Sequence, residues 1–284
     1  MRQIILAGFA LIAVLCHAAM AAALDDKHKE ILVLLEHSGL TQVIEQLPQF
    51  IQEGMNDSLQ GQESEISRDD VSAISNILQQ SFASDVIMHD TIAHMELHYD
   101  KQRITHVLNY LTSPLGAKMI ALEKASSTPA SYEAMLDYAA KLEASPPDEG
   151  RVAVLLELDR ASHTTELTVA MQLEIFRTIM LVMGAYASEQ GAPQLAGDML
   201  EQTIAVMAEH VREEAQGMTL ISFLFTYQDA SDTELREYIK IHNDQDIQWY
   251  LALSSSALIH SLSRAMGKAG QGIVRHLRGT ERSS

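Results

Sequence analysis

A short stretch of the sequence, residues 89 to 98, carries five side chains that can bind a metal ion. They are His89, Asp90, His94, Glu96 and His98. Asp90, His94 and His98 recur at intervals of four residues, so an α-helix would place all three on one face. Neutral imidazoles together with a carboxylate suit zinc, copper or nickel. The pattern therefore predicts one candidate site for a divalent transition metal, in a metal carrier or a metal-dependent enzyme.

The order of these residues does not encode the metalloprotease motif. His-Glu-x-x-His keeps its two histidines on one helical face with a glutamate as general base, whereas the order His94-x-Glu96-x-His98 turns Glu96 away from that face. Histidines on a packed or solvated helical surface are the default alternative. We therefore expect no cofactor and keep a divalent transition metal as the alternative.

Motifs for nucleophilic catalysis and for phosphate binding have no diagnostic instance in this sequence. The diagnostic motifs of these kinds are Gly-x-Ser-x-Gly and Ser-x-x-Lys for a serine nucleophile and the P-loop for phosphate. The formal net charge of −18 disfavours non-specific binding to nucleic acid. These observations favour a protein that is not an enzyme and does not bind nucleic acid.

Methionines concentrate in the second half of the chain, on segments rich in leucine, isoleucine and valine. Flexible thioether side chains can line an adaptable groove for apolar ligands or unfolded segments. The alternative is that they fill irregular gaps in the core, and helical spacing does not separate the two. The candidates for an apolar groove are Met171, Met180, Met183 and Met207.

The N-terminal residues have the pattern of a cleavable export signal. Arg2 precedes an apolar run, and small residues follow up to Ala21, so we expect a signal peptide over residues 1–21, with cleavage at 23 as the alternative. The only cysteine, Cys16, lies inside this leader, which excludes disulfides from the mature protein. Charged residues interrupt the most apolar internal run, 171–187, so we expect no transmembrane span after cleavage. The predicted location is the periplasm.

Apolar residues three and four positions apart predict an all-α fold, a multi-helix bundle with two related helical halves. We expect short helices over 26–54 broken at Ser38-Gly39, a loop over 56–66, one helix from Ser67 to Leu97, and helix starts at Asp100, Ser113-Pro114 and Thr128-Pro129. Further helices are expected over Glu149–Ser162, Thr164–Ser188, Pro193–Gln216, Met218–Tyr227, Ser231–His242 and Asp244–Gly267, with a capping box formed by Ser231 and Glu234.

The clearest linker is Ser145-Pro146-Pro147-Asp148, because consecutive prolines do not continue a helix. It divides the predicted organisation into an N-terminal half over 24–145 and a C-terminal half over 148–266. Residues 267–284 are locally basic and are interrupted by glycines, which predicts a flexible tail.

A shift of 131 positions aligns the apolar residues of one segment with those of another. The pairs are Ile104 with Leu235, Val107 with Tyr238, Leu108 with Ile239, Tyr110 with Ile241, Ile120 with Leu251 and Leu122 with Leu253. Because apolar periodicity is kept across the shift, we predict an internal duplication. Any two amphipathic helices agree at some offset, which is the alternative explanation.

A motif within the first copy has the form of an apolar helix, then Ser-Pro-x-Gly-x-Lys, then another helix. Ser113, Pro114, Gly116 and Lys118 match it. This stretch resembles an exported bacterial family, domain of unknown function 2059. A second, diverged copy includes Trp249 and Tyr250, with Asp244, Gln245 and Ile247 in place of the serine, proline and glycine. The resemblance implies an all-helical exported protein and supplies no catalytic residues.

The motif also has a direct physical interpretation. Ser113 caps a helix that begins at Pro114, and Gly116 allows another segment to approach closely. Lys118 near the helix start is either solvated or bound to an anion or a partner's carboxylate. Trp249 and Tyr250 are either core residues or an exposed aromatic contact.

The sequence thus predicts a periplasmic binding or interaction module whose partner is an envelope protein, a peptide or a lipid. A metal-binding protein or metal-dependent enzyme using Asp90, His94 and His98 is one alternative. A structural, self-assembling envelope protein is another, and the oligomeric state stays open.

Overall fold

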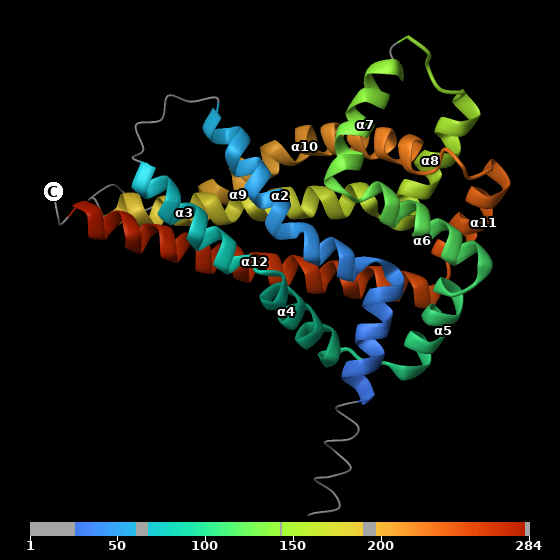
Figure 1. The fold of residues 1–284 in the computed structure, drawn as a ribbon, viewed down its shortest axis with the longest axis horizontal. Helices are drawn as coiled ribbons and strands as arrows, with labels where there is room; N and C mark the ends of the chain where they lie inside the picture. Colours follow the sequence, from blue (N-terminus) through green and yellow to red (C-terminus); the bar gives the residue numbers. More distant parts are fainter. Residues whose placement is uncertain (1–25, 61–67, 143, 190–196, 282–284) are drawn as a thin grey trace, which may run out of the picture.

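The computed structural model describes residues 26–60, 68–142, 144–189 and 197–281, and within these ranges the chain forms helices and no strand (Figure 1). The predicted all-α fold is confirmed, whereas the predicted signal peptide lies outside the described residues. A helix over 26–38 is followed by α2 (Leu40–Gln60), α3 (Arg68–Ser81), α4 (Ser84–Leu97), α5 (Lys101–Leu111), α6 (Pro114–Ser126), α7 (Pro129–Leu142), α8 (Glu149–Ser162), α9 (Thr164–Glu189), α10 (Gly197–Thr226), α11 (Asp232–His242) and α12 (Gln245–Glu281).

The last helix, α12, organises the bundle. It runs along the long axis of the molecule and packs against α3, α4, α5 and α9, while α10 lies against the other side of α9 (Figure 1). Two polar contacts join α12 to α4: the buried hydroxyls of Thr91 and Ser261 are 3.0 Å apart, and Nε of the exposed Arg264 lies 3.2 Å from Oδ2 of the buried Asp90. Because these contacts need matching positions on both helices, they fix the register of α4 along α12.

The buried residues form three clusters that draw on both predicted halves of the chain. One joins the helix 26–38, α4 and α5 to the start of α12. A second joins α6 to α8, α10 and α11. The third joins α2 and α4 to the middle of α12. The halves predicted over 24–145 and 148–266 therefore share their cores and do not have one each.

Several predicted helix starts are confirmed by their capping bonds. Asp100 accepts hydrogen bonds from the amides of Gln102 and Arg103, and Ser113 Oγ accepts one from the amide of Gly116. Ser231 and Glu234 make both bonds of a capping box. Each of these signals acts within four residues, which is why the sequence alone locates them.

Three predicted boundaries are wrong. The helix predicted over 67–97 is two helices that break at Phe82 and Ala83, although neither a glycine nor a proline lies there. Phe82 is 4% exposed and packs into the core cluster of α2, α4 and α12 at this break. Conversely, α10 continues through Gly217 and α2 continues into the predicted loop, to Gln60.

The predicted tail from residue 267 is the last part of α12 as far as Glu281. Ala269 and Gly270 are buried there. A Cβ atom added at Gly272 would lie 2.7 Å from Ile77 Cγ2 on α3. Gly272 therefore allows α12 to pack closely on α3, and this packing outweighs the low helix propensity of glycine at that position.

The bounds of α11 lie 131 residues after those of α5, and α12 begins 131 residues after α6. The duplication itself stays a prediction. Within the described ranges, no helix has both the length and the apolar character that crossing a membrane requires.

Candidate functional site

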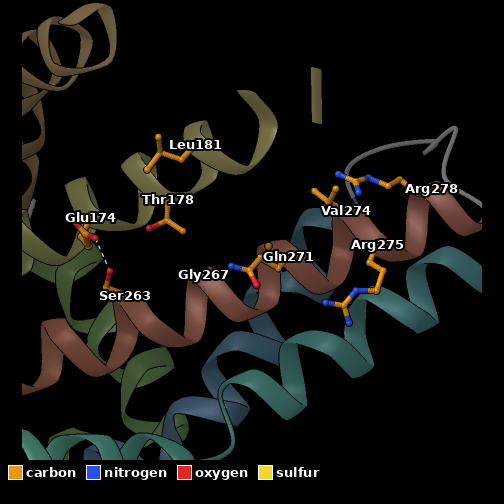
Figure 2. Close-up of a pocket in the computed structure, with 10 residues that line it drawn as sticks. Glu174, Thr178, Leu181, Ser263, Gly267, Gln271, Val274, Arg275 and Arg278 are labelled. Atoms are coloured by element: carbon orange, nitrogen blue, oxygen red, sulfur yellow. Dashed lines mark hydrogen bonds between the residues drawn. The ribbon is translucent and has the colours of Figure 1, made fainter. Parts of the chain in front are cut away.

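The leading candidate site is a cavity of about 560 Å³ between α9 and α12. Leu181 and Thr178 approach from α9, and Val274 and Gln271 from α12 (Figure 2). Gly267 and Gly270 also line it, and the absence of side chains at these positions leaves room between the helices. Its volume lies within the range of pockets that hold small organic ligands, about 300–1,000 Å³.

The two ends of this cavity differ in charge. At one end Ser263 donates a hydrogen bond of 2.8 Å to Glu174, whose carboxylate also lies 3.5 Å from Arg177. At the other end Arg275 and Arg278 lie one turn apart on α12 (Figure 2). From Ser263 to Arg278 the helix rises about 22 Å, at about 1.5 Å per residue. The cavity is thus long, partly apolar, and positively charged at one end.

Three of the four methionines predicted to form a groove, Met171, Met180 and Met207, are not among the described residues that line this cavity. Met171 is partly buried and packs against the cluster of α2, α4 and α12. Met180 and Met207 are half-buried on α9 and α10. The side chain of Met183 lies outside the described residues. The structure does not bring the described methionines into one common groove.

A second cavity, of about 520 Å³, lies among α2, α6, α7, α9 and α10. Its lining is rich in hydroxyls, including those of Thr164, Thr168 and Ser222, and contains no lysine or arginine among the described residues. The buried carbonyl oxygen Oε1 of Gln46 lines it and lacks a hydrogen-bond partner within the described part of the chain. Among its described lining residues, this cavity therefore lacks the positively charged end that distinguishes the first.

The three residues predicted to bind a metal separate into two groups. Asp90 is buried and pairs with Arg264 on α12. His94 instead contacts two other rings, with centroid distances of 5.6 Å to His98 and 5.1 Å to His260. His260 was not among the predicted ligands, because it is 162 residues away from His98 and only tertiary packing brings it to α4.

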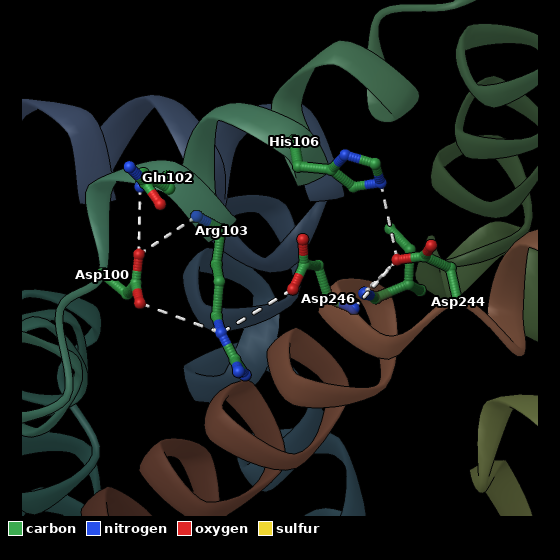
Figure 3. A network of polar contacts seen from close by, with 7 residues as sticks. Asp100, Gln102, Arg103, His106, Asp244 and Asp246 are labelled. Atoms are coloured by element: carbon green, nitrogen blue, oxygen red, sulfur yellow. Dashed lines mark hydrogen bonds and ion pairs between the residues drawn. The ribbon is translucent and has the colours of Figure 1, made fainter.

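Another group with metal-binding side chains, His106, Asp244 and Asp246, lies where α5 meets the start of α12 (Figure 3). Asp244 Oδ1 already accepts hydrogen bonds from the first amides of α12, and His106 Nε2 lies 3.5 Å from it. Asp246 lies 3.7 Å from the guanidinium of Arg103. The helix N-terminus and the guanidinium of Arg103 already balance the negative charge of these two carboxylates, so the group is better explained as a helix cap.

The matching residues of the family motif form a tight junction. A Cβ atom added at Gly116 would lie 2.3 Å from the backbone oxygen of Tyr110 and 3.1 Å from that of Leu111, so the close approach is by the last turn of α5. Lys118 Nζ lies 2.6 Å from Glu234 Oε1. The anion that Lys118 binds in the structure is therefore a carboxylate of the same chain, on α11.

Trp249 and Tyr250, in the stretch predicted to be a diverged second copy, both lie against the core. Tyr250 is 6% exposed, and burial raises the pKa of its hydroxyl to about 12. Trp249 packs at the edge of the same cluster, with the guanidinium of Arg103 5.5 Å from its ring. The core interpretation of these residues fits their burial better than an exposed aromatic contact.

A buried carboxylate that sequence reasoning missed lies between α6, α10 and α11. Tyr227 and Tyr238 donate hydrogen bonds of 2.7 and 2.6 Å to Glu123 Oε1. Burial raises the pKa of Glu123, and the two phenol donors only partly oppose this shift. The hydroxyl of Tyr110 is also buried, without a hydrogen-bond partner in the described residues. The cluster ties α6 to α11 and to the turn that follows α10.

The cavity residues on α12 were also missed, because the glycines indicated a tail. One signal for them is present in the sequence, because the lining residues of α12 recur at intervals of one, three and four, which is the spacing of one helical face. These residues include Gly267, Gly270, Gln271, Val274 and Arg278.

Comparisons with family models, curated proteins and solved structures found no match for this chain.

Proposed function

We propose that this protein is a non-enzymatic, periplasmic binding module that holds an anionic amphiphile, such as a fatty acid, in the cavity between α9 and α12. One observation carries the proposal: a long, partly apolar cavity ends at two arginines in a chain whose net charge is −18. Arginine guanidinium groups suit carboxylate and phosphate headgroups because they donate paired hydrogen bonds. The positive end would attract the headgroup, and the apolar walls would contact the chain.

The cavity wall favours an alkyl chain over a larger rigid ligand. Leu181 and Val274 offer apolar surface, and the glycines of α12 leave space along the helix. Leu181 is 57% exposed, and two neighbours on α9, Ile175 and Ile179, are 41% and 44% exposed. Exposed apolar surface of this kind loses contact with water when it covers a hydrocarbon chain.

The predicted export signal and the predicted duplication complete the proposal. Export would place the module in the periplasm, where it would act on envelope lipids or peptides. The equal offset of α5 from α11 and of α6 from α12 supports an origin by duplication. Self-assembly without a ligand is the competing proposal, and a stable homo-oligomer that binds no amphiphile would favour it.

The test is displacement of a fluorescent long-chain fatty acid by oleate, with the mature protein and a variant that narrows the cavity. Gly267 lines the cavity, and a Cβ atom added there meets nothing within 4 Å. Gly267→Leu therefore adds a side chain without a backbone clash. We expect it to weaken oleate binding about tenfold or more while it leaves the fold intact, because leucine favours a helix more than glycine does.

Gly217→Leu is the matched control. Gly217 lies within α10, and a Cβ atom added there also meets nothing within 4 Å. It does not line the cavity between α9 and α12, so the same substitution should leave oleate binding unchanged. Arg278→Gln should reduce the preference for oleate over oleyl alcohol, which lacks the carboxylate. Equal binding of oleate by wild type, Gly267→Leu and Arg278→Gln would refute the proposal.

A further inference from the structure

The second cavity, of about 520 Å³ among α2, α6, α7, α9 and α10, is lined by several polar groups that are available to bind a ligand. Oε1 of Gln46 is buried and accepts no hydrogen bond within the described part of the chain. The hydroxyls of Thr219 and Ser222, on α10, likewise make no hydrogen bond to another described residue, and Thr219 is only 7% exposed. A buried polar group without a partner costs free energy, which a ligand that bonds to it recovers.

Two further hydroxyls of the lining offer lone pairs and no proton. Thr168 Oγ1 donates a hydrogen bond of 3.0 Å to the backbone oxygen of Thr164, and Ser127 Oγ donates one of 2.6 Å to that of Glu123. Because a hydroxyl has one proton and two lone pairs, these oxygens can accept a bond from a ligand but cannot donate one to it. The carbonyl oxygen of Gln46 is also only an acceptor. The cavity therefore favours a ligand that carries several O–H or N–H donors.

The charges of the lining favour a neutral ligand. Lysine and arginine are absent from its described residues, so an anion finds no cation there. Glu214 is the one carboxylate among these described residues; it is exposed and lies 3.2 Å from Nε2 of His210. Water screens such an exposed carboxylate, so it attracts an ammonium group only weakly. The donors that suit this cavity are thus uncharged.

Aromatic and thioether side chains supply the apolar part of the wall. Tyr132 on α7 is 50% exposed, whereas Phe223 on α10 and Met135 on α7 are buried. A sugar ring has a rim of hydroxyls and two faces of C–H groups, and these faces lose contact with water when they cover such side chains. A wall that combines hydrogen-bond acceptors with an accessible aromatic ring matches this distribution.

We propose that this cavity binds a neutral saccharide, a disaccharide in size. Its hydroxyls donate to the acceptors of Gln46, Thr168 and Ser127, and one ring face covers Tyr132. The cavity volume lies within the range of pockets that hold small organic ligands, about 300–1,000 Å³. The two cavities share no lining residue, so saccharide binding is a second activity beside the proposed binding of an amphiphile.

The experiment is saturation-transfer-difference NMR of the mature protein, titrated in turn with maltose, cellobiose, trehalose and N,N′-diacetylchitobiose. We expect at least one of them to bind, and Gln46→Leu and Ser222→Ala each to raise its dissociation constant about threefold or more through the lost hydrogen bond. Neither change should unfold the protein, because leucine and alanine both favour a helix, and circular dichroism checks this. Gln202→Leu is the matched control. Gln202 is an exposed glutamine of α10 that lines neither cavity, so its replacement should leave the dissociation constant unchanged.

Three results would overturn the proposal. If none of the disaccharides binds to wild type, or if neither Gln46→Leu nor Ser222→Ala weakens binding, the cavity is not a saccharide site. If the diamine putrescine binds in place of the disaccharides, the cavity selects cationic and not neutral donors. If Gly267→Leu abolishes saccharide binding and Gln46→Leu does not, the sugar occupies the cavity between α9 and α12. Unchanged saccharide binding by Gly267→Leu, with weaker binding by Gln46→Leu, supports the proposal and separates it from the test of amphiphile binding.

Discussion

Two glutamates on facing helices, Glu123 on α6 and Glu234 on α11, have pKa values that are shifted in opposite directions. Lys118 lowers the pKa of Glu234 to about 2, assisted by the backbone amide and hydroxyl of Ser231. Burial instead raises the pKa of Glu123, although Tyr238 and Tyr227 donate hydrogen bonds to it. The same interface between α6 and α11 thus lowers the pKa of Glu234 and raises the pKa of Glu123.

The difference shows which physical effect dominates at each place. Glu234 is partly exposed, so its carboxylate keeps much of its hydration and also gains a cation 2.6 Å away. Glu123 has no cation beside it in the described structure, and its two donors, Tyr227 and Tyr238, are buried neutral phenols. Neutral donors stabilise an anion less than a cation does, and they do not offset the loss of water.

We expect the largest effect from Gly116→Ala, because it displaces the helix that carries both Lys118 and Glu123. The added Cβ would lie 2.3 Å from the Tyr110 backbone oxygen, an atom that cannot move without distorting the end of α5. The free energy of unfolding should fall by about 3 kcal/mol. Urea unfolding followed by circular dichroism measures this change.

Gly217→Ala is the control for the helix propensity of alanine. Gly217 has no atom within 4 Å of an added Cβ, so this variant should gain up to about 1 kcal/mol. If Gly116→Ala were as stable as wild type, the close approach of α5 to α6 would not constrain residue 116.

The junction and the tyrosine cluster also show what a sequence can predict. Ser113, Pro114 and Gly116 act within a few residues, and the cap that they form follows from their order alone. Glu123 meets Tyr227 and Tyr238 across more than 100 residues, and nothing in their spacing identifies the contact. The sequence therefore predicted the helix starts and the fold class, while the long-range polar contacts required the packed structure.

The same limit applies to the candidate sites. The low helix propensity of the glycines after residue 267 favours a tail, whereas the structure continues α12 through them, with Gly272 packed against Ile77 on α3. Asp90, His94 and His98 were grouped by helical period. That period relates Asp90 and His94 on α4 to His98 at its C-cap, but it does not show that Arg264 pairs with Asp90 or that His260 contacts His94.

The next effect in size is the pH dependence that Glu123→Gln removes. Because the pKa of Glu123 is raised in the folded protein from an ordinary value of 4.5, the unfolded chain loses this proton first as the pH rises. The contribution of Glu123 to stability is therefore full below about pH 4.5 and declines above it, by up to about 1.4 kcal/mol per pH unit. Glutamine keeps an oxygen acceptor for the phenols and does not ionise.

Urea unfolding of wild type and Glu123→Gln between pH 4.5 and 8 measures the difference. The stability of the variant relative to wild type should rise with pH, and a constant difference would contradict a raised pKa. Tyr238→Phe sharpens the test, because removing one donor should raise the pKa of Glu123 further. It should also cost about 1–3 kcal/mol, by leaving a buried acceptor with one bond fewer.

The smallest effect belongs to the exposed member of the comparison. Lys118→Met removes the main cause of the low pKa of Glu234 and leaves the bonds from Ser231 in place. The pKa should rise from about 2 toward its ordinary value of 4.5, which NMR titration of the Glu234 carboxyl measures. A group with a lowered pKa in the folded protein contributes stability above about pH 4.5, and this contribution is lost as the pH falls toward 2. The free energy of unfolding of the variant should therefore differ from that of wild type most at neutral pH and least at pH 2.

High salt should reduce this difference in stability, because the pair of Lys118 and Glu234 is solvent-accessible, whereas high salt should leave the effect of Glu123→Gln nearly unchanged. Equal salt sensitivity of the two variants would mean that burial does not separate the two glutamates.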